Sequence, residues 1–131
     1  MLPAALGTHA RGSTIRPASF CGAYALKPTY GAINRQGVFS AAESMDHLCT
    51  FAGSLSDMWI IARHMSKTAG GDPGHPGLYG GSRAPTPAKP ARLIRLDTAG
   101  WAQTDTASKQ AFDDFIDLLA GDGVEIFSRE D

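Results

Sequence analysis

A short loop of small residues near the start of the chain, ending in a serine, restricts the possible folds more than any other segment. Residues 7–13 read GTHARGS, and the sequence that follows as far as Gly31 is rich in turn-forming residues. Small residues allow the backbone to turn tightly and allow main-chain N–H groups to converge on one point. The sequence therefore predicts an ordered loop that exposes the hydroxyl of Ser13 beside backbone donors.

The composition is ordinary for a soluble globular protein and excludes several other classes of protein. The chain has 131 residues and a net charge of −1. Because it contains no basic block and no apolar run of about 18 residues, we expect no nucleic-acid partner and no membrane partner. The start of the chain lacks the charged segment of a signal peptide, so we expect a cytoplasmic protein. Cys21 and Cys49 are expected to be small buried residues in a reducing compartment.

Turn signals and hydrophobic periodicity predict the structure of residues 1–69. The first part is expected to form short strands and ordered loops rather than helices, with strands at 23–26 and 48–52. Ser54 has the spacing of a helix cap, and apolar residues follow it at helical intervals. We therefore expect an amphipathic helix that begins after Ser54 and ends at Gly70.

The second half of the chain combines a connection with a compact βαβ pattern. Residues 70–90 are rich in proline and glycine, which predicts a long surface connection without regular structure. Residues 91–131 read as a strand, a helix capped by Asp105 or Thr106, and a final strand. The sequence thus predicts one α/β domain over residues 1–131, with a mixed sheet flanked by helices.

The segment from residue 7 to residue 31 resembles the serine-containing part of the amidase signature family. The resemblance rests on the GTHARGS loop, on FCG at residues 20–22 and on LKPTYG at residues 26–31, and it continues more weakly over the remaining chain. Members of that family hydrolyse carboxamides through an acyl-enzyme. The resemblance implies a partial amidase-type domain, that is, a fragment with a mixed β-sheet flanked by helices.

The same resemblance assigns a role to each residue of the loop. The nucleophile would be Ser13, and the backbone N–H groups of Ala10, Arg11 and Gly12 would form the oxyanion hole. In the family, a serine in a cis peptide relays the proton to a lysine base, and both are expected to lie before residue 1. A serine hydroxyl is a poor nucleophile without a base, so the chain alone is expected to be inactive. No cofactor and no metal are implied.

The loop departs from the family pattern at three positions. Where the family has GTDTGGS or GTQTGGS, this chain has His9, Ala10 and Arg11. Arg11 puts a long cation where a small residue lets the acyl group approach the backbone. If that position needs a positive φ, a residue other than glycine also costs roughly 1–2 kcal/mol. Ala10 removes a hydroxyl that could stiffen the loop through a local hydrogen bond.

A phosphate-binding loop is an alternative interpretation of residues 7–14, because Gly7 and Gly12 have the spacing of that motif. The lysine that would reach the phosphates is replaced by Ser13. No strong apolar strand is expected before the loop, and Pro17 is expected to obstruct a helix after it. The sequence therefore disfavours this alternative.

Two functions from different classes remain open. The first is an amidase-type hydrolase that acts on a small amide substrate when completed by the polypeptide that carries the lysine and the cis serine. The second is a non-catalytic remnant, or an interaction subunit of an amidase-like assembly. Unpaired strand edges and exposed apolar surface would then favour self-association or a complementing chain.

Overall fold

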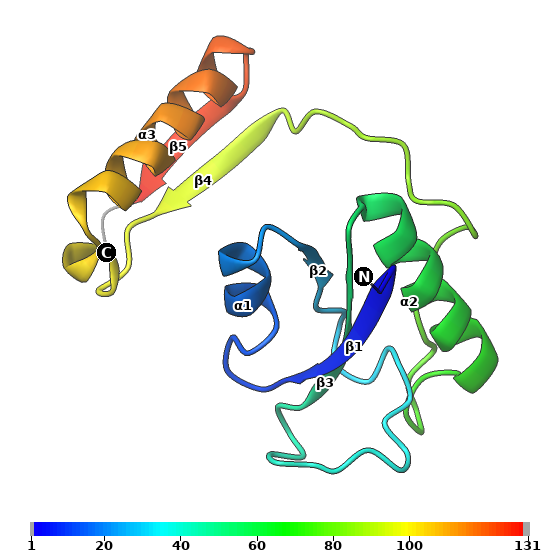
Figure 1. Cartoon of the computed structure of the whole chain (residues 1–131). Helices are drawn as coiled ribbons and strands as arrows, with labels where there is room; N and C mark the ends of the chain where they lie inside the picture. Colours follow the sequence, from blue (N-terminus) through cyan, green and yellow to red (C-terminus); the bar gives the residue numbers. More distant parts are fainter. Residues whose placement is uncertain (1, 130–131) are drawn as a thin grey trace. The chain divides into compact units, whose positions relative to one another are not determined.

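The strands and helices of the chain fall into two units, Met1–Thr86 and Pro87–Asp131 (Figure 1). The structure is a computed structural model and describes residues 2–129. Each unit has its own sheet and at least one helix. The α/β class and the presence of mixed sheet and helix, both expected from the sequence, are confirmed.

The first unit is built on a three-stranded antiparallel sheet with β3 at its centre. β1 (Ala4–His9) and β2 (Tyr24–Leu26) pair with the two edges of β3 (His47–Ala52). The register places His9 opposite His47, at the end of β1 from which the serine loop departs. The strands predicted at 23–26 and 48–52 are confirmed as β2 and β3.

The segments that flank the serine loop differ from the sequence-based expectation. β1 precedes the loop, although its residues show no strong apolar pattern, because β3 provides hydrogen bonds along its whole length. The short helix α1 (Ile15–Phe20) follows the loop, where no helix was expected. Pro17 is the third residue of α1, and proline is tolerated in a first turn because N–H groups there have no intrahelical acceptor.

The helix predicted after Ser54 is confirmed as α2 (Leu55–Ala69), which packs on β2 and β3. The Ser54 hydroxyl oxygen accepts a hydrogen bond from the Asp57 N–H at 3.1 Å and donates one to the Asp57 carboxylate at 2.8 Å. Gly70, with a φ of 74°, ends the helix. The cap and the stop residue are therefore those that the sequence indicates.

The core of the first unit is small and lies where α1, α2 and the loop after β2 meet the sheet. Its buried hydrophobic residues are Ala18, Ala32, Ile33, Cys49, Ala52, Met58 and Ala62. The expectation of a buried thiol is correct for Cys49 and wrong for Cys21, which is exposed. Cys21 is the C-cap residue of α1 and lies outside the sheet, so neither element covers it.

The proline- and glycine-rich connection contains no helix or strand over residues 70–91, as predicted. Its first part is nevertheless pinned to the first unit, because the Asp72 N–H donates to the Gly31 carbonyl at 2.8 Å. A Cβ on Gly71 would lie 2.6 Å from the His75 carbonyl oxygen and 2.7 Å from that of Gly31. Only glycine allows the two backbone segments to come this close.

The second unit is a βαβ arrangement, as predicted. β4 (Arg92–Leu96) and β5 (Glu125–Arg129) pair in parallel, and α3 (Thr106–Gly121) connects them after the 3₁₀ turn η1 (Trp101–Gln103). Asp105 is the N-cap of α3, which decides between the two caps that the sequence allowed.

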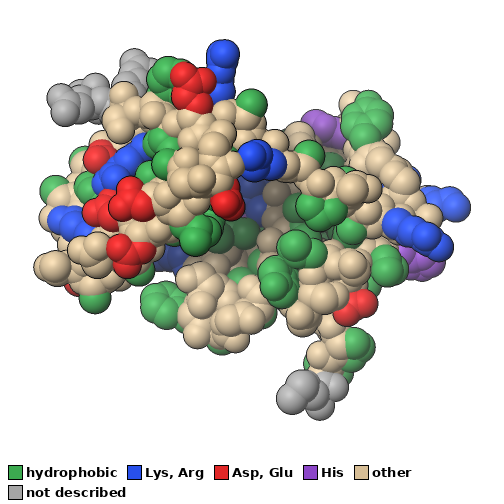
Figure 2. Space-filling view, turned by 90° about the horizontal axis from the view of Figure 1, so that it is seen from above, with side chains coloured by type: hydrophobic (Ala, Val, Ile, Leu, Met, Phe, Trp, Pro, Cys, Tyr) green, Lys and Arg blue, Asp and Glu red, His purple; other side chains and the backbone are tan. Residues whose placement is uncertain are grey.

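Apolar side chains reach the surface at many places (Figure 2). In the second unit, the side chains of Ile94 and Leu96 on β4 are 66% and 58% exposed, and that of Phe127 on β5 is 46% exposed. Parallel sheets are normally covered on both faces. This two-stranded sheet differs, because one of its faces presents apolar side chains to solvent. None of the helices in residues 2–129 has both the length and the apolar character needed to cross a bilayer.

The Ser54 cap gives a test of the fold. We expect Ser54→Ala to lower the free energy of unfolding by about 1 kcal/mol, because the Asp57 N–H loses its acceptor. Ser56→Ala is the matched control, since Ser56 is an exposed residue of the first turn of α2 and alanine is the better helix former. Urea unfolding followed by far-ultraviolet circular dichroism measures both. Equal effects of the two substitutions would contradict the capping role.

Candidate functional site

Ser13 lies in the exposed loop between the end of β1 and the start of α1. Its hydroxyl donates a hydrogen bond to the carbonyl of Thr8 at 3.1 Å. Within residues 2–129, the structure gives this hydroxyl no hydrogen bond to a lysine, a histidine or a carboxylate. The hydroxyl is therefore exposed and held by a main-chain carbonyl.

The turn before Ser13 is made by Gly12, whose φ is +96°. A Cβ at this position would lie 2.9 Å from Nε of Arg16, the side chain that also donates to the carbonyls of Arg11 and Gly12. Arg11 itself has no positive φ, because the non-glycine residues described all have negative values. The strain that the sequence raised for Arg11 therefore does not arise, and its side chain is exposed.

The three backbone N–H groups before Ser13 differ in whether they have a hydrogen-bond acceptor. The Gly12 N–H donates to Nε2 of His9 at 3.1 Å. The N–H groups of Ala10 and Arg11 have no acceptor among residues 2–129. Two of the three donors assigned to an oxyanion hole are thus free to donate to a ligand oxygen, and the third faces the His9 ring.

His9 lies beneath the loop, with 8% of its surface exposed. Its Nδ1 atom is 3.1 Å from the Thr14 nitrogen, so its two ring nitrogens face main-chain donors on either side of Ser13. Burial lowers the pKa of His9 below its ordinary value of 6.5, and the positive charges of Lys27, His47 and Arg16 lower it further. Sequence reasoning noted His9 only as a departure from the aspartate or glutamine of the family, and that departure was the available signal.

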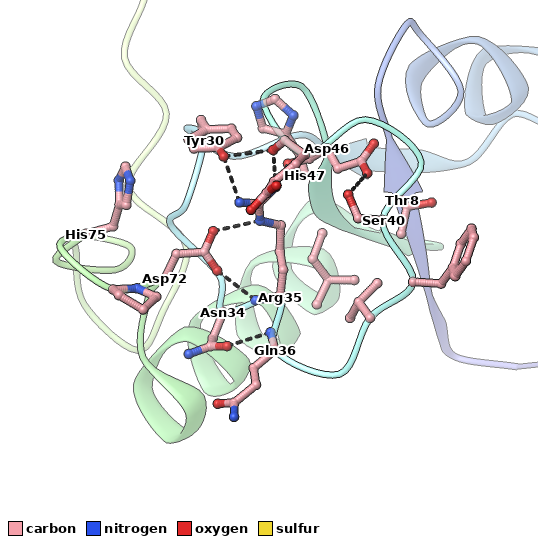
Figure 3. Close-up of a pocket in the computed structure, with 15 residues that line it drawn as sticks. Thr8, Tyr30, Asn34, Arg35, Gln36, Ser40, Asp46, His47, Asp72 and His75 are labelled. Atoms are coloured by element: carbon pink, nitrogen blue, oxygen red, sulfur yellow. Dashed lines mark hydrogen bonds and ion pairs between the residues drawn. The ribbon is translucent and has the colours of Figure 1, made fainter.

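A cavity of about 550 Å³ is lined in part by Thr8 of β1 (Figure 3). Its walls come from β1, from the loop between β2 and β3, from the start of β3 and from residues 72–75. Ser13 does not line the cavity. Thr8 connects the two features, because its side chain lines the cavity and its carbonyl accepts the hydrogen bond from Ser13.

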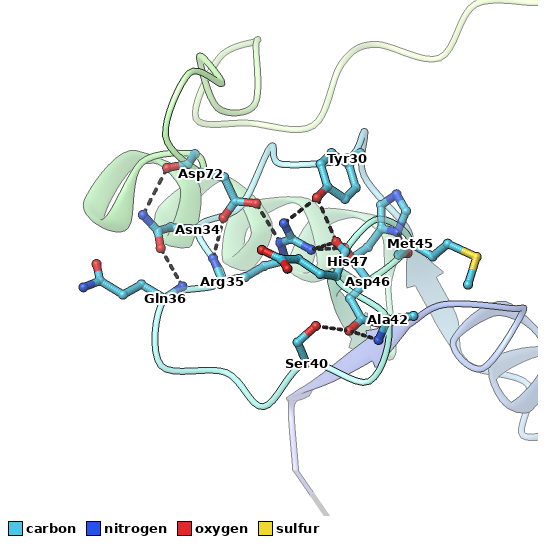
Figure 4. A network of polar contacts seen from close by, with 12 residues as sticks. Tyr30, Asn34, Arg35, Gln36, Ser40, Ala42, Met45, Asp46, His47 and Asp72 are labelled. Atoms are coloured by element: carbon cyan, nitrogen blue, oxygen red, sulfur yellow. Dashed lines mark hydrogen bonds and ion pairs between the residues drawn. The ribbon is translucent and has the colours of Figure 1, made fainter.

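Arg35 organises one wall of this cavity together with Asp72, which lies 37 residues further along the chain (Figure 4). The Arg35 backbone N–H donates to one carboxylate oxygen of Asp72 at 2.8 Å, and its Nε donates to the other at 2.6 Å. The two side chains are only 18% and 11% exposed. The pair therefore ties the loop after β2 to the connection after α2.

The remaining donors of Arg35 are also occupied. Nη1 donates to the carbonyls of Glu43 and Asp46 at 2.8 and 2.9 Å, and Nη2 donates to the hydroxyl of Tyr30 at 2.8 Å. The guanidinium carbon lies 4.5 Å from the centre of the Tyr30 ring, which adds a cation–π contact. With these partners, Arg35 forms part of the wall rather than a binding group for an anionic ligand.

Hydrogen bonds keep the two carboxylates of the cavity wall, Asp72 and Asp46, in their ionised form. Burial alone would raise the pKa of Asp72, but the backbone N–H and the guanidinium of Arg35 outweigh it and hold the pKa below the ordinary value. The N–H of Ala42, the hydroxyl of Ser40 and the N–H of Ala41 lower the pKa of Asp46 in the same way. Both carboxylates therefore stay ionised well into the acid range.

The sequence predicts no metal ligand in the site. The part of the chain that the structure describes contains no group of three histidine, cysteine or acidic residues able to hold a metal ion. His47 points its Nδ1 at the Met45 carbonyl at 2.7 Å. The rings of His47 and His75 both make edge contacts with Tyr30, at 5.7 and 5.6 Å between centres. These histidines belong to the cavity wall.

The Arg35–Asp72 pair predicts a large effect on stability. We expect Arg35→Met to lower the free energy of unfolding by about 3–5 kcal/mol, because it leaves the buried Asp72 carboxylate without its partner. Urea unfolding followed by Trp59 fluorescence, in a Trp101→Phe background, measures the change. Arg83→Met, at an exposed arginine, is the matched control and should shift stability by less than about 0.5 kcal/mol. Similar shifts for the two substitutions would contradict the assignment.

Comparison with known proteins gives relatives for the chain. The protein is 42% identical over 73 residues to the A-type subunit of glutamyl-tRNA(Gln) amidotransferase from Thermus thermophilus, an alignment that covers 56% of this chain and 15% of that protein. It is 46% identical over 70 residues to the protein of the same name from Synechococcus sp., covering 53% of this chain and 14% of that protein. The counterpart from Treponema pallidum is also 46% identical over 70 residues, covering 53% and 13%.

The aligned segment is thus a small part of these curated relatives, between 13% and 15% of their length. A family model described as Amidase matches residues 1–130, which is almost the whole chain. This match decides the family: the chain belongs to the amidase family.

Proposed function

We propose that the chain supplies the nucleophile of an amide hydrolase, with Ser13 attacking the carbonyl carbon of a small carboxamide. The observation that carries the proposal is the exposed Ser13 hydroxyl, which closely follows the free N–H groups of Ala10 and Arg11. Membership of the amidase family supports the same chemistry. The amidotransferases among the relatives are named for transfer of an amide group, which fits a carboxamide substrate.

In the proposed reaction, the Ser13 oxygen forms a bond to the carbonyl carbon as its proton passes to a base. The negative charge that develops on the carbonyl oxygen is stabilised by backbone donors, each worth about 10²–10³ in rate. Ala10 and Arg11 supply two of them, and Gly12 supplies a third once its N–H turns away from His9. The carbon–nitrogen bond then breaks, the nitrogen takes a proton and leaves, and water hydrolyses the acyl-enzyme. These steps use no cofactor.

The base in this reaction is proposed to come from elsewhere, because the described residues give the Ser13 hydroxyl no hydrogen bond to a basic side chain. The Ser13 hydroxyl donates to the carbonyl of Thr8, which holds the proton in place without removing it. We infer that the lysine and the relay serine of the family come from polypeptide outside residues 2–129. The chain alone is then expected to bind a small amide weakly and to turn over none.

A second candidate function is that of an interaction or complementing subunit. The apolar face of the β4–β5 sheet favours it, since Ile94, Leu96 and Phe127 are each at least 46% exposed. Among residues 2–129, β1 and β2 each pair with β3 through one edge, which leaves their outer edges free to pair. Both features fit a chain that packs against further polypeptide, in a catalytic assembly or without catalysis. A chain that sediments as a monomer and binds no hydrophobic dye would speak against this candidate.

Fluorophosphonate labelling tests the first candidate. A chimera that carries the first unit of this chain, residues 1–86, in place of the similar segment of the Thermus thermophilus relative is designed to provide the rest of an amidase. We expect the probe to modify Ser13 in the chimera, as read by peptide mass spectrometry, and to modify the isolated chain at least tenfold more slowly, in line with the roughly 10²–10⁴ contributed by a positioned base.

Matched variants complete this test. Ser13→Ala should abolish labelling of the chimera, whereas Ser19→Ala, at an exposed serine of α1, should leave it unchanged. A chimera that folds but is not labelled would refute the hydrolase proposal for this loop and favour the interaction role. Rapid labelling of the isolated chain would confirm the nucleophile but contradict the inference that its base lies elsewhere.

A further inference from the structure

The ring of His9 occupies an unusual position, because each of its nitrogens faces a backbone N–H. Nε2 is 3.1 Å from the nitrogen of Gly12, and Nδ1 is 3.1 Å from the nitrogen of Thr14. These two residues are the immediate neighbours of Ser13. Thr14 is fully buried and His9 is 8% exposed, so water does not readily replace either contact. The ring therefore bridges the main chain on both sides of the nucleophile.

The chemistry of imidazole limits what this bridge can do. A neutral ring has one nitrogen that accepts and one that carries a proton, and a protonated ring has no acceptor. The neutral ring therefore satisfies one of the two N–H groups at a time, and its tautomer decides which. When Nδ1 accepts from Thr14, the Gly12 N–H is left for another acceptor. When the ring is protonated, both N–H groups face a cation and lose their acceptor.

We propose that neutral His9 is a positioning residue for Ser13, and that its protonation releases the main chain at the buried Thr14, directly after the serine. The tautomer with the lone pair on Nδ1 anchors the buried Thr14 and leaves the Gly12 N–H for the carbonyl oxygen of the substrate. The role in catalysis rests on the proposed amidase function, whereas the role in holding the loop does not.

The surroundings of His9 support a ring that is neutral near pH 7. The groups that face it are Lys27 after β2, His47 on β3 and Arg16 on α1, and all three disfavour a second positive charge. The ring centres of His9 and His47 are 6.1 Å apart. Because the folded protein takes up a proton at His9 less readily than the unfolded chain, the loop is held above the ordinary pKa of 6.5 and is loosened as the pH falls through the lower, folded pKa.

Backbone amides report this loosening without any catalytic assay. We expect the amide resonances of Gly12 and Thr14 in the whole chain to titrate together as the pH falls below the ordinary pKa of 6.5, with a midpoint below that value. Corrected for intrinsic rate, the hydrogen exchange of the Thr14 amide should become roughly fivefold to tenfold faster across this transition, as expected for loss of one hydrogen bond.

Three variants separate the possible causes. His9→Gln keeps an acceptor and does not titrate, so the Thr14 amide should stay protected and both amide resonances should be independent of pH. His9→Leu fills similar space without an acceptor, so exchange at Thr14 should be fast at every pH. His47→Gln removes a neighbouring group that lowers the pKa of His9, so the transition should persist with its midpoint moved upward. A transition that survives in His9→Gln, or that disappears in His47→Gln, would overturn the proposal.

Labelling of Ser13 in the chimera separates this inference from the proposed function. If the amidase function and the role of His9 are both correct, the rate of Ser13 labelling falls with the same acidic midpoint as the amide titration. His9→Gln then removes this acidic fall from the pH profile. If the amides respond as expected but Ser13 is never labelled, the amidase function fails and the structural role of His9 stands. If Ser13 is labelled with one pH profile in wild type and in His9→Gln, the function stands and a catalytic role for His9 is refuted.

Discussion

The pairing of β1 with β3 is the interaction on which the geometry around Ser13 depends. Its register sets His9 opposite His47 and turns the His9 ring beneath the loop rather than toward solvent. A slip of one residue would move every β1 side chain to the opposite face of the sheet. The ring would then leave the N–H groups of Gly12 and Thr14, and the carbonyl of Thr8 would no longer point at the serine hydroxyl.

A second constraint fixes the other side of this strand. The Arg35–Asp72 pair joins two loops that are far apart in the sequence, and the carbonyls of Glu43 and Asp46 complete the shell around the guanidinium. β3 begins directly after Asp46, so this shell adjoins the end of β3 at which His47 pairs with His9 of β1.

Local signals in the sequence predicted the elements whose stability is local. The Ser54 cap, the end of α2 at Gly70 and the βαβ pattern of the second unit all follow from short-range spacing and periodicity. The elements that sequence reasoning missed depend on their surroundings in the fold. β1 has little hydrophobic pattern and is a strand because β3 pairs with it, and α1 tolerates Pro17 only because of its place in the first turn.

For the candidate site too, the sequence predicted the residues that a local motif marks and missed those that the fold brings together. The motif identified Ser13 and the donors before it, and these assignments remain predictions that the labelling experiments test. The Arg35–Asp72 pair could not be read from the sequence, because nothing local links residues 37 positions apart. His9 appeared only as an exception to the family pattern. Its role became visible once the fold placed both ring nitrogens against the loop backbone.

The most direct test of the role of His9 is a measurement of scalar coupling across its hydrogen bonds, made by nuclear magnetic resonance on the ¹⁵N-labelled chain at neutral pH. A coupling between a ring nitrogen of His9 and the amide nitrogen of Thr14 or Gly12 would show that the imidazole holds the backbone beside Ser13, which is the result we expect. A neutral ring without coupling to either amide would contradict the central claim, because the loop would then be held by other contacts.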